Sequence, residues 1–232
     1  MINSFPIKLS IIIPVFNEQS IVETYLSKIQ SHPQIEIIVV DGQSIDQTVL
    51  LAQQFPVKVV ISPHKGRGNQ LNYGASIATG EILCFLHLDS QLPPNYLSVI
   101  ENQLSLPTAI AGAFSLGIDA SGWSFRLLET LVNWRSRFCS LPYGDQALFL
   151  KAETFRKMGG FAKLPIMEDY EFVQRLKKRG KIQIAAAKIL TSSRRWQKLG
   201  IFKTTLINQM MIIGYYFKID PNILARWYRS QK

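Results

Sequence analysis

Two aspartates each follow an apolar run in the first half of the chain. Asp41 comes directly after the run at 35–40, and Asp89 comes after the run at 82–88. A carboxylate at the end of a buried strand can accept hydrogen bonds from a nucleobase or from ribose hydroxyls. One carboxylate together with substrate phosphates is also a common site for a hard cation such as Mg²⁺ or Mn²⁺. These residues predict a nucleotide and metal site. The alternative is that Asp41 and Asp46 only form turns and helix caps, the interpretation that we favour for Asp46.

His87 stands two residues before Asp89, so in an extended strand both side chains would point to the same side. Both could then face one cation, or His87 could simply be a polar residue at a strand end. Tetrahedral zinc is disfavoured, because neither Cys84 nor Cys139 is spaced to complete its ligand set. Asp89 is therefore the first metal candidate and His87 the second.

An arginine flanked by glycines, Gly66-Arg67-Gly68, precedes a helix expected at 69–78. It does not continue as the dinucleotide-binding pattern, because Leu71 stands where the third glycine is required. A guanidinium at a helix start still suits a phosphate, through its paired donors and the helix dipole. We predict that Arg67 contacts a diphosphate or the metal site.

The second half contains two further polar clusters. Glu168 and Asp169 begin a helix expected at 167–179, and Gly144-Asp145-Gln146 lies between an expected helix and strand. Carboxylates at a helix start can act as general bases or can only stabilise the helix dipole. The Gly144–Gln146 segment could bind the donor sugar or an acceptor hydroxyl, and a plain turn is a comparable alternative.

Uninterrupted apolar runs are typical of parallel strands that helices cover on both faces. We expect strands at 9–15, 35–40, 57–61 and 82–88. Helices are expected at 18–30, at 44–55 with Ser44 and Gln47 as a capping box, at 69–78, and after Pro93-Pro94. Strands at 109–116, 147–150 and 182–189, helices at 125–138 and 167–179, and two closing helices would extend the same sheet. The pattern predicts an α/β fold with a mostly parallel central sheet flanked by helices, in which Asp41 and Asp89 share one crevice.

The 232 residues predict a single domain whose halves differ in charge. Residues 1–116 carry five Lys and Arg against eight Asp and Glu, whereas residues 117–232 carry twenty-one against eight. A basic half favours an anionic partner, for which nucleic acid, an acidic membrane surface and a phosphate-bearing substrate are candidates. A solvated basic face without a specific partner is the alternative.

The C-terminal segment has apolar residues at helical spacing: Ile201, Leu206, Met210, Ile213 and Phe217. With nearby Lys and Arg, this stripe could rest on an anionic membrane, but packing into the domain's own core is slightly favoured. No run approaches the roughly 20 apolar residues of a membrane span. The two cysteines predict buried free thiols in a reducing compartment, hence a cytoplasmic protein, with peripheral membrane contact as an option.

Five motifs in order resemble glycosyltransferases of family 2, which have the GT-A fold, and the resemblance spans nearly the whole chain. They are IIIPVFNE at 11–18, VVDGQSIDQT at 39–48, GRG at 66–68, HLD at 87–89 and ED at 168–169. GRGNQLN at 66–72, PYGDQA at 142–147 and DP at 220–221 are further similar to a bacterial subgroup described as radical-SAM/selenodomain-associated transferases.

The resemblance implies a role for each matching position. Asp41 would bind the base and ribose, with Pro14, Glu18 and Arg67 also on the donor side. Asp89 would be the metal-binding aspartate of the D-x-D motif, whose first position is His87 in this chain. Asp169 would be the general base of an inverting enzyme. Arg195-Trp196 resembles a shortened Q-x-x-R-W motif whose glutamine position does not match.

These implications predict an enzyme that transfers a sugar from a nucleoside-diphosphate donor, with inversion and a Mn²⁺ or Mg²⁺ cofactor. Residues 1–116 would bind the nucleotide, and residues 117–232 would bind an unknown acceptor, either lipid-linked or anionic. Two alternatives are a basic nucleic-acid-binding module, with Trp residues among the cations of the second half, and an inactive relative that binds a nucleotide. The acidic strand ends and the absence of a nucleic-acid signature argue against the first alternative.

Overall fold

The computed structural model describes residues 8–29 and 32–231. Its strands are β1 (Leu9–Val15), β2 (Ile35–Asp41), β3 (Lys58–Ile61), β4 (Ile82–Phe85), β5 (Ser90–Gln91), β6 (Ala109–Asp119), β7 (Leu148–Lys151) and β8 (Lys181–Ser192). Its helices are α1 (Val22–Leu26), α2 (Thr48–Ala52), α3 (Arg67–Ile77), α4 (Tyr96–Leu104), α5 (Trp123–Cys139), α6 (Ala152–Lys157), α7 (Glu168–Lys177), α8 (Arg194–Leu199), α9 (Ile201–Tyr216) and α10 (Pro221–Ser230), with a short 3₁₀ turn, η1 (Gly144–Gln146).

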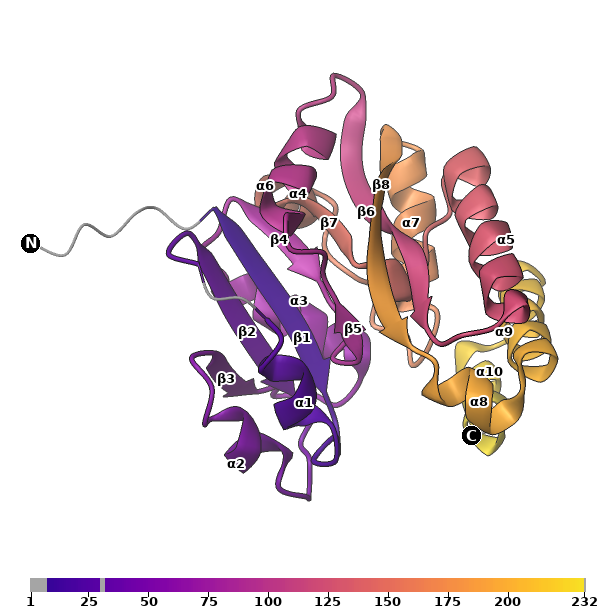
Figure 1. Cartoon of the computed structure of the whole chain (residues 1–232), viewed down its shortest axis with the longest axis horizontal. Helices are drawn as coiled ribbons and strands as arrows, with labels where there is room; N and C mark the ends of the chain where they lie inside the picture. Colours follow the sequence, from indigo (N-terminus) through magenta and orange to yellow (C-terminus); the bar gives the residue numbers. More distant parts are fainter. Residues whose placement is uncertain (1–7, 30–31, 232) are drawn as a thin grey trace, which may run out of the picture.

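One eight-stranded sheet runs through the molecule in the order β3-β2-β1-β4-β7-β6-β8-β5. The β3-β2-β1-β4 block is parallel, as the βαβ pattern predicts, and β6 pairs with β8 in parallel as well. β7 lies antiparallel between β4 and β6, and therefore joins the two blocks. Figure 1 shows the first block at the left of the view and β6 and β8 to its right.

Helices cover both faces of the sheet, which is why the strands are apolar on both sides. α1, α2 and α4 pack on one face against Leu9, Ile11 and Ile13. α3, α6 and α7 pack on the other face against Ile12, and Phe155, Phe161 and Phe172 fill that core with ring contacts. The expectation of a doubly covered α/β sheet is confirmed.

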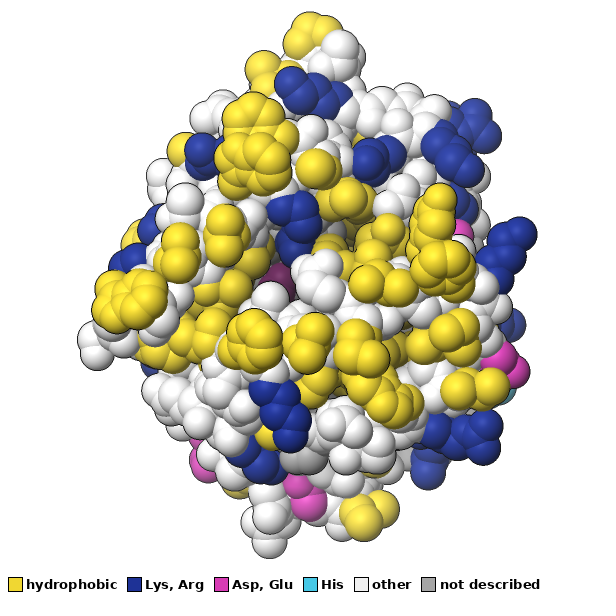
Figure 2. Space-filling model, turned by 90° about the vertical axis from the view of Figure 1, so that its right-hand side faces the viewer, with side chains coloured by type: hydrophobic (Ala, Val, Ile, Leu, Met, Phe, Trp, Pro, Cys, Tyr) yellow, Lys and Arg dark blue, Asp and Glu magenta, His cyan; other side chains and the backbone are white. Residues whose placement is uncertain are grey.

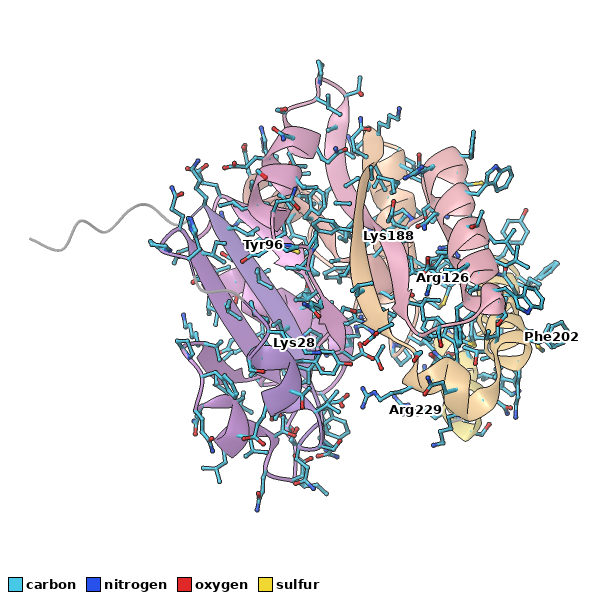
Figure 3. All side chains as sticks on the ribbon, viewed as in Figure 1. Lys28, Tyr96, Arg126, Lys188, Phe202 and Arg229 are labelled. Carbon is cyan, nitrogen blue, oxygen red and sulfur yellow. The ribbon has the colours of Figure 1, made fainter. Side chains whose placement is uncertain are left out.

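In the second half, α5 is held against β6 by a buried carboxylate. Glu129 of α5 accepts a hydrogen bond from the Ile118 main-chain N–H at 2.7 Å. It also pairs with Arg126 at 2.8 Å and Lys188 at 3.0 Å, both labelled in Figure 3. Leu128 of α5, Trp196 of α8 and Ile201 of α9 share a further small core. The C-terminal helices therefore belong to the body of the molecule and gather beside α5 (Figure 1).

Several expected elements differ from the structure. The fourth strand ends at Phe85 instead of 88, because the next residues turn away so that β5 can pair with β8. The helix expected at 18–30 is confined to Val22–Leu26, and residue 30 lies outside the described ranges. Three helices close the chain instead of two, and β5, η1 and α6 had no counterpart in the prediction.

The expected capping box of Ser44 and Gln47 is wrong. The Ser44 hydroxyl accepts instead from the main-chain N–H of Asn17, so it ties the loop after β1 to the loop after β2. Gln47 is the N-cap residue of α2 without a side-chain cap, and the helix begins only at Thr48. Asp46 forms a turn, as favoured, by accepting from the Thr48 N–H at 3.0 Å.

The two cysteines are free, but burial holds for Cys84 alone. Cys139 is the last residue of α5 and is exposed, so the prediction of two buried thiols is wrong for this residue. Within residues 8–29 and 32–231, none of the helices is both long and apolar enough to cross a bilayer.

Candidate active site

Asp41 lies at the carboxyl end of β2, between Val15 of β1 and Ile61 of β3. It is 1% exposed, and its Oδ2 accepts from the Ser44 main-chain N–H at 2.9 Å. Its Oδ1 is buried and has no hydrogen-bond partner. Because a buried carboxylate oxygen without a partner is costly, this atom suits a ligand donor such as a nucleobase N–H or a ribose hydroxyl.

Gln70 of α3 fixes the ends of β1 and β2 under this position. Its Nε2 donates to the main-chain carbonyls of Val15 and Val40, both at 2.8 Å. A Cβ at Gly42 would lie 3.0 Å from the Gln70 amide, so glycine is needed for this close approach. Glu18, farther along the first loop, is half-buried, and its main-chain N–H donates to Thr48 Oγ1 at 2.8 Å.

Three candidate side chains from different segments meet at Gly144 of η1. A Cβ placed on this glycine would lie 2.7 Å from Asp169 Oδ2, 2.9 Å from His87 Nε2 and 3.1 Å from Arg67 Nη2. The Gly144 main-chain N–H donates to the same Asp169 oxygen at 2.9 Å. Arg67, His87, Gly144 and Asp169 also line one cavity with Pro14. The structure therefore brings together residues that are up to 155 positions apart in the sequence, from Pro14 to Asp169.

The charges around this point are unusual because the groups are buried. Glu168 is 6% exposed and faces Arg67 Nε at 3.6 Å. Burial, and then the Asp169 carboxylate, raises the pKa of Glu168. Burial, and then the Arg67 guanidinium, holds the pKa of His87 well below its usual range, so its imidazole is neutral at pH 7.

The pKa of Asp145, the residue after Gly144, is also shifted. Burial raises the pKa of Asp145 to about 6, and the nearby Asp169 carboxylate acts in the same direction, whereas the Arg135 guanidinium opposes the shift. The Arg135 guanidinium also stacks on the Tyr143 ring at 3.4 Å from its centroid, which attaches α5 to this loop. Carboxylates with shifted pKa values beside a cavity are typical of active sites, and Asp145 and Glu168 each adjoin a residue that lines this one.

Asp89 lies in the turn between β4 and β5, which crosses to the other edge of the crevice. Its main-chain carbonyl accepts from Ser192 N–H at 3.0 Å, and its Oδ2 lies 3.6 Å from Arg194 Nη2. Because the strand ends before this turn, the strand alternation that was expected to aim His87 and Asp89 at one cation does not apply. His87 instead reaches the cavity beside Gly144.

The side chains at the site provide only some of the ligands that a divalent cation needs. Among the described residues, no group of three or more His, Cys, Asp or Glu side chains is arranged to hold a metal ion. Asp89 is partly exposed at the crevice and could supply one carboxylate, with substrate phosphates as the remaining ligands. The neutral His87 imidazole retains a buried Nε2 without a partner.

Three low-ranked candidates have partners within the protein. Gln146 is fully buried, accepts from Ser136 Oγ at 2.7 Å and donates to the Phe114 carbonyl at 2.9 Å, so it holds η1 in place. Arg195 donates to the Tyr228 hydroxyl and stacks on that ring. Trp196 packs in the core that α5, α8 and α9 share.

Four residues at the site were missed as candidates: Gln70, Arg135, Tyr143 and Arg194. Arg135 lies within the helix expected at 125–138, so nothing in its own spacing marks it. Arg194 is the first residue of α8 and belongs to the Arg194-Arg195-Trp196 segment that resembles a shortened Q-x-x-R-W motif. Tyr143 adjoins the Gly144 segment, and Gln70 lies in the glycine-flanked motif of Arg67. For Tyr143 and Gln70, closeness to these motifs was therefore the signal in the sequence that could have identified them.

Curated relatives match parts of the chain. A dolichol-phosphate mannosyltransferase of Pyrococcus furiosus is 32% identical over 130 residues, which cover 51% of this chain and 36% of that protein. A GalNAc(5)-diNAcBac-PP-undecaprenol beta-1,3-glucosyltransferase of Campylobacter jejuni is 32% identical over 102 residues, 40% of this chain and 33% of that protein. This chain thus spans about a third of the length of these relatives.

Solved structures share the fold at low identity. A mannosyltransferase of Pyrobaculum calidifontis in complex with GDP-Man and Mn²⁺ superposes with a TM-score of 0.66 and 20% identity, over 81% of this chain and 57% of that one. TarS of S. aureus superposes with a TM-score of 0.58 and 18% identity, over 81% and 61% of the two chains. These likenesses confirm the α/β GT-A fold.

The family model for glycosyl transferase family 2 matches residues 10–162. That range contains Asp41, Arg67 and Asp89 and ends before Asp169. Because the match covers more than half of the 232 residues, this chain belongs to glycosyl transferase family 2.

Proposed function

We propose that the chain is a glycosyltransferase that moves a sugar from a nucleoside-diphosphate donor to an acceptor hydroxyl with inversion. The observation that carries this proposal is the meeting of Arg67, His87 and Asp169 around Gly144, at the carboxyl ends of β1 and β4. A cation that can neutralise a diphosphate and a carboxylate that can act as a base thereby face one cavity, together with a neutral imidazole.

On the donor side, residues 1–116 bind the nucleotide. The partnerless Oδ1 of Asp41 accepts from the base or ribose, and Arg67 at the start of α3 neutralises the diphosphate. Pro14 lines the floor of the cavity, and Glu18 follows β1 at the same edge of the sheet. Asp89, together with the diphosphate, would hold the divalent cation, and His87 would be a lesser ligand. When bound, this cation would stabilise charge on the departing diphosphate.

On the acceptor side, residues 117–232 supply the base. Asp169 takes the proton of the acceptor hydroxyl, whose oxygen then bonds to the anomeric carbon. The bond from that carbon to the diphosphate oxygen breaks, and the nucleoside diphosphate leaves with the electron pair. The Gly144 and Tyr170 N–H groups hold the Asp169 carboxylate at 2.9 and 2.7 Å. Gly144, Asp145 and Glu168 would contact the sugar or the acceptor. Gln146 holds η1, whereas Arg195 and Trp196 have their partners within the protein.

We further propose a lipid-linked or anionic acceptor, reached from the cytoplasm at a membrane surface. The names of the Pyrococcus and Campylobacter relatives, which contain dolichol-phosphate and PP-undecaprenol, support this class, and so does the basic second half. The motifs GRGNQLN and PYGDQA support membership of the radical-SAM/selenodomain-associated subgroup.

The test measures transfer of a labelled sugar to a bacterial lipid extract in the presence of Mn²⁺. The donors are sugars linked to UDP, GDP, CDP or dTDP. Asp169→Asn keeps the shape of the side chain but removes its proton affinity, so transfer should fall by about 10²-fold or more while donor binding persists. Glu171→Gln, on the same helix but paired with Arg175, is the matched control and should keep activity.

If the transfer rate of Asp169→Asn were within a few-fold of the wild-type rate, Asp169 would not be the general base, and Glu168 or Asp145 would be the next candidate. Donor binding without turnover by the wild type on any acceptor would favour an inactive relative. Binding of nucleic acid but of no nucleoside diphosphate would favour the nucleic-acid module.

A further inference from the structure

We propose that the outer faces of α5 and α9 form one apolar docking surface by which the protein lies on an anionic membrane, with the active-site cavity next to that membrane. This inference rests on the proposed function only for the acceptor. The docking surface itself is defined by exposed side chains of two helices.

The first part of the surface is a stripe along α5. Its side chains recur at the spacing of one helix face: Trp123, Leu127, Leu131, Trp134 and Phe138. Each is between 50% and 79% exposed, although a helix of a water-soluble domain normally turns such residues inward. The opposite face of α5 is the one that packs on the sheet, through Leu128 and Glu129.

The second part is a stripe along α9 with the same spacing: Phe202, Leu206, Met210, Ile213 and Phe217, the last directly after the helix. These side chains are between 46% and 83% exposed. The inner face of α9 consists of Thr204, Ile207, Met211 and Gly214. The expectation that the C-terminal stripe packs into the core is therefore wrong for four of its residues and holds in part for Ile201, which is half-buried.

The two stripes lie on the same side of the molecule. Figure 2 looks at that side and shows apolar side chains spread over much of it, around a hollow, with Lys and Arg among and around them. In Figure 3, Phe202 projects away from the body at the α9 edge, whereas Arg229 lies on the opposite side of the C-terminal helices in this view. A patch of this kind marks an interaction surface.

Charge favours a bilayer as the occupant. Residues 121–143 and 193–231 carry ten Lys and Arg but only two acids, Glu129 and Asp220. Glu129 is buried, and Asp220 caps α10 through the Asn222 N–H. Arg126 pairs with Glu129 and Arg194 with Asp89, whereas the other described cations of these segments form no ion pair. Apolar insertion combined with cation attraction is how interfacial helices hold anionic lipid.

A second copy of the chain fits this surface less well. A symmetric dimer through α5 and α9 would bury this cation-rich patch of one copy against the same patch of the other, so that cations would face cations. Like charges facing across an interface oppose association, whereas anionic head groups would neutralise them.

The docking surface lies on helices that also contact the segments around the active-site cavity. The inner side of α5 holds η1, through Arg135 on the Tyr143 ring and Ser136 on Gln146. The inner side of α9 packs beside Asp169, since the Tyr215 ring contacts Tyr170 at 5.6 Å between centroids. Both docking helices therefore touch the segments that flank the proposed base. An acceptor anchored in the bilayer would reach the base over a short path.

The test is co-sedimentation with vesicles of phosphatidylcholine alone and of equal parts phosphatidylcholine and phosphatidylglycerol. We expect binding only to the anionic vesicles, falling steeply with salt. Leu131→Ser/Ile213→Ser removes one side chain from each stripe and should lower the partition coefficient on the order of 100-fold, because each lost side chain is worth roughly tenfold. The matched control is Leu50→Ser/Leu106→Ser, which changes exposed leucines on the first half of the chain and should bind like wild type.

Tryptophan emission gives a second reading of insertion. Trp123 and Trp134 are 79% and 59% exposed, so anionic vesicles should shift the emission to the blue, and Trp123→Phe/Trp134→Phe should lose that shift. Absence of sedimentation at low salt, or equal loss in both double variants, would overturn the proposal. So would a concentration-dependent dimer that leaves vesicles unbound. Nucleoside-diphosphate binding by Leu131→Ser/Ile213→Ser should be unchanged, which separates a failure of docking from a failure of the proposed function.

Discussion

Gly144 is the residue on which the proposed active site depends, because it has no side chain. Its backbone is not in the left-handed region, so alanine would fit its conformation. Alanine would not fit its surroundings, since Asp169, His87 and Arg67 all lie within 3.1 Å of the position of its Cβ. Sequence spacing ranked this glycine low, because a turn explains a glycine equally well. Only the meeting of three distant segments gives it a role.

The raised pKa of Asp145 predicts how the free energy of unfolding changes with pH. Burial raises the pKa of Asp145 to about 6 in the folded protein, above the usual value of an aspartate. The unfolded chain therefore loses this proton at lower pH than the folded protein, so the group lowers stability as pH rises from about 4 to 6. Asp145→Asn should be more stable than wild type at pH 7, by roughly 1 to 3 kcal/mol, and this difference should vanish near pH 4.

Urea unfolding across this pH range, with a chelator present, measures the difference. Asp119→Asn, which changes an exposed carboxylate, should show no such pH dependence. A stability difference between Asp145→Asn and wild type that is the same at pH 4 and pH 7 would mean that Asp145 titrates normally.

At the scale of elements, α3 carries Arg67 and Gln70 to the site and must lie very close to the sheet. A Cβ at Gly74 would be 2.5 Å from Ile12 Cγ2 and 2.9 Å from Val40 Cγ2. Gly74→Ala should therefore overpack this contact and destabilise the fold by about 1 to 3 kcal/mol, as measured by denaturant unfolding. The helix propensity of alanine acts in the opposite direction by up to about 1 kcal/mol.

Ser76→Ala, two residues farther along α3 on its exposed face, is the control and should change stability by less than about 0.5 kcal/mol. If Gly74→Ala were more stable than wild type, α3 could move away from β1 and β2 at little cost. The placement of Arg67 would then not depend on this contact.

The elements also show where sequence reasoning succeeds and where it fails. β1 was predicted with its observed bounds, because a continuous apolar run followed by polar residues leaves little choice. β4 was predicted three residues too long, since Leu86 and Leu88 are apolar and buried but lie in the turn towards β5. A local run of apolar residues indicates burial. It cannot indicate that Ser90 of β5 pairs with Thr191 of β8, because these residues are far apart along the chain.

On the scale of the whole molecule, β7 joins the two blocks of the sheet and sets the crevice between them. β2 contributes Asp41 at its end, and the turn after β4 contributes His87. Asp89 reaches across to Arg194, the first residue of α8, which follows β8. The sequence could predict the strand-end acids, since each follows its own strand. It could not predict the role of Arg135 or the contact of Arg194 with Asp89, because these depend on how α5 and β8 pack beside β6.

The central claim is that this crevice binds a nucleoside diphosphate with the help of a divalent cation. The most direct measurement is calorimetric titration of UDP, GDP, CDP and dTDP into wild type and Asp89→Ala, with Mn²⁺ or with a chelator. We expect at least one nucleotide to bind wild type about tenfold or more tightly with Mn²⁺, and Asp89→Ala to lose that difference. Equal affinity of wild type with Mn²⁺ and with chelator would contradict the metal assignment, and no binding of any of the four nucleotides would contradict the central claim.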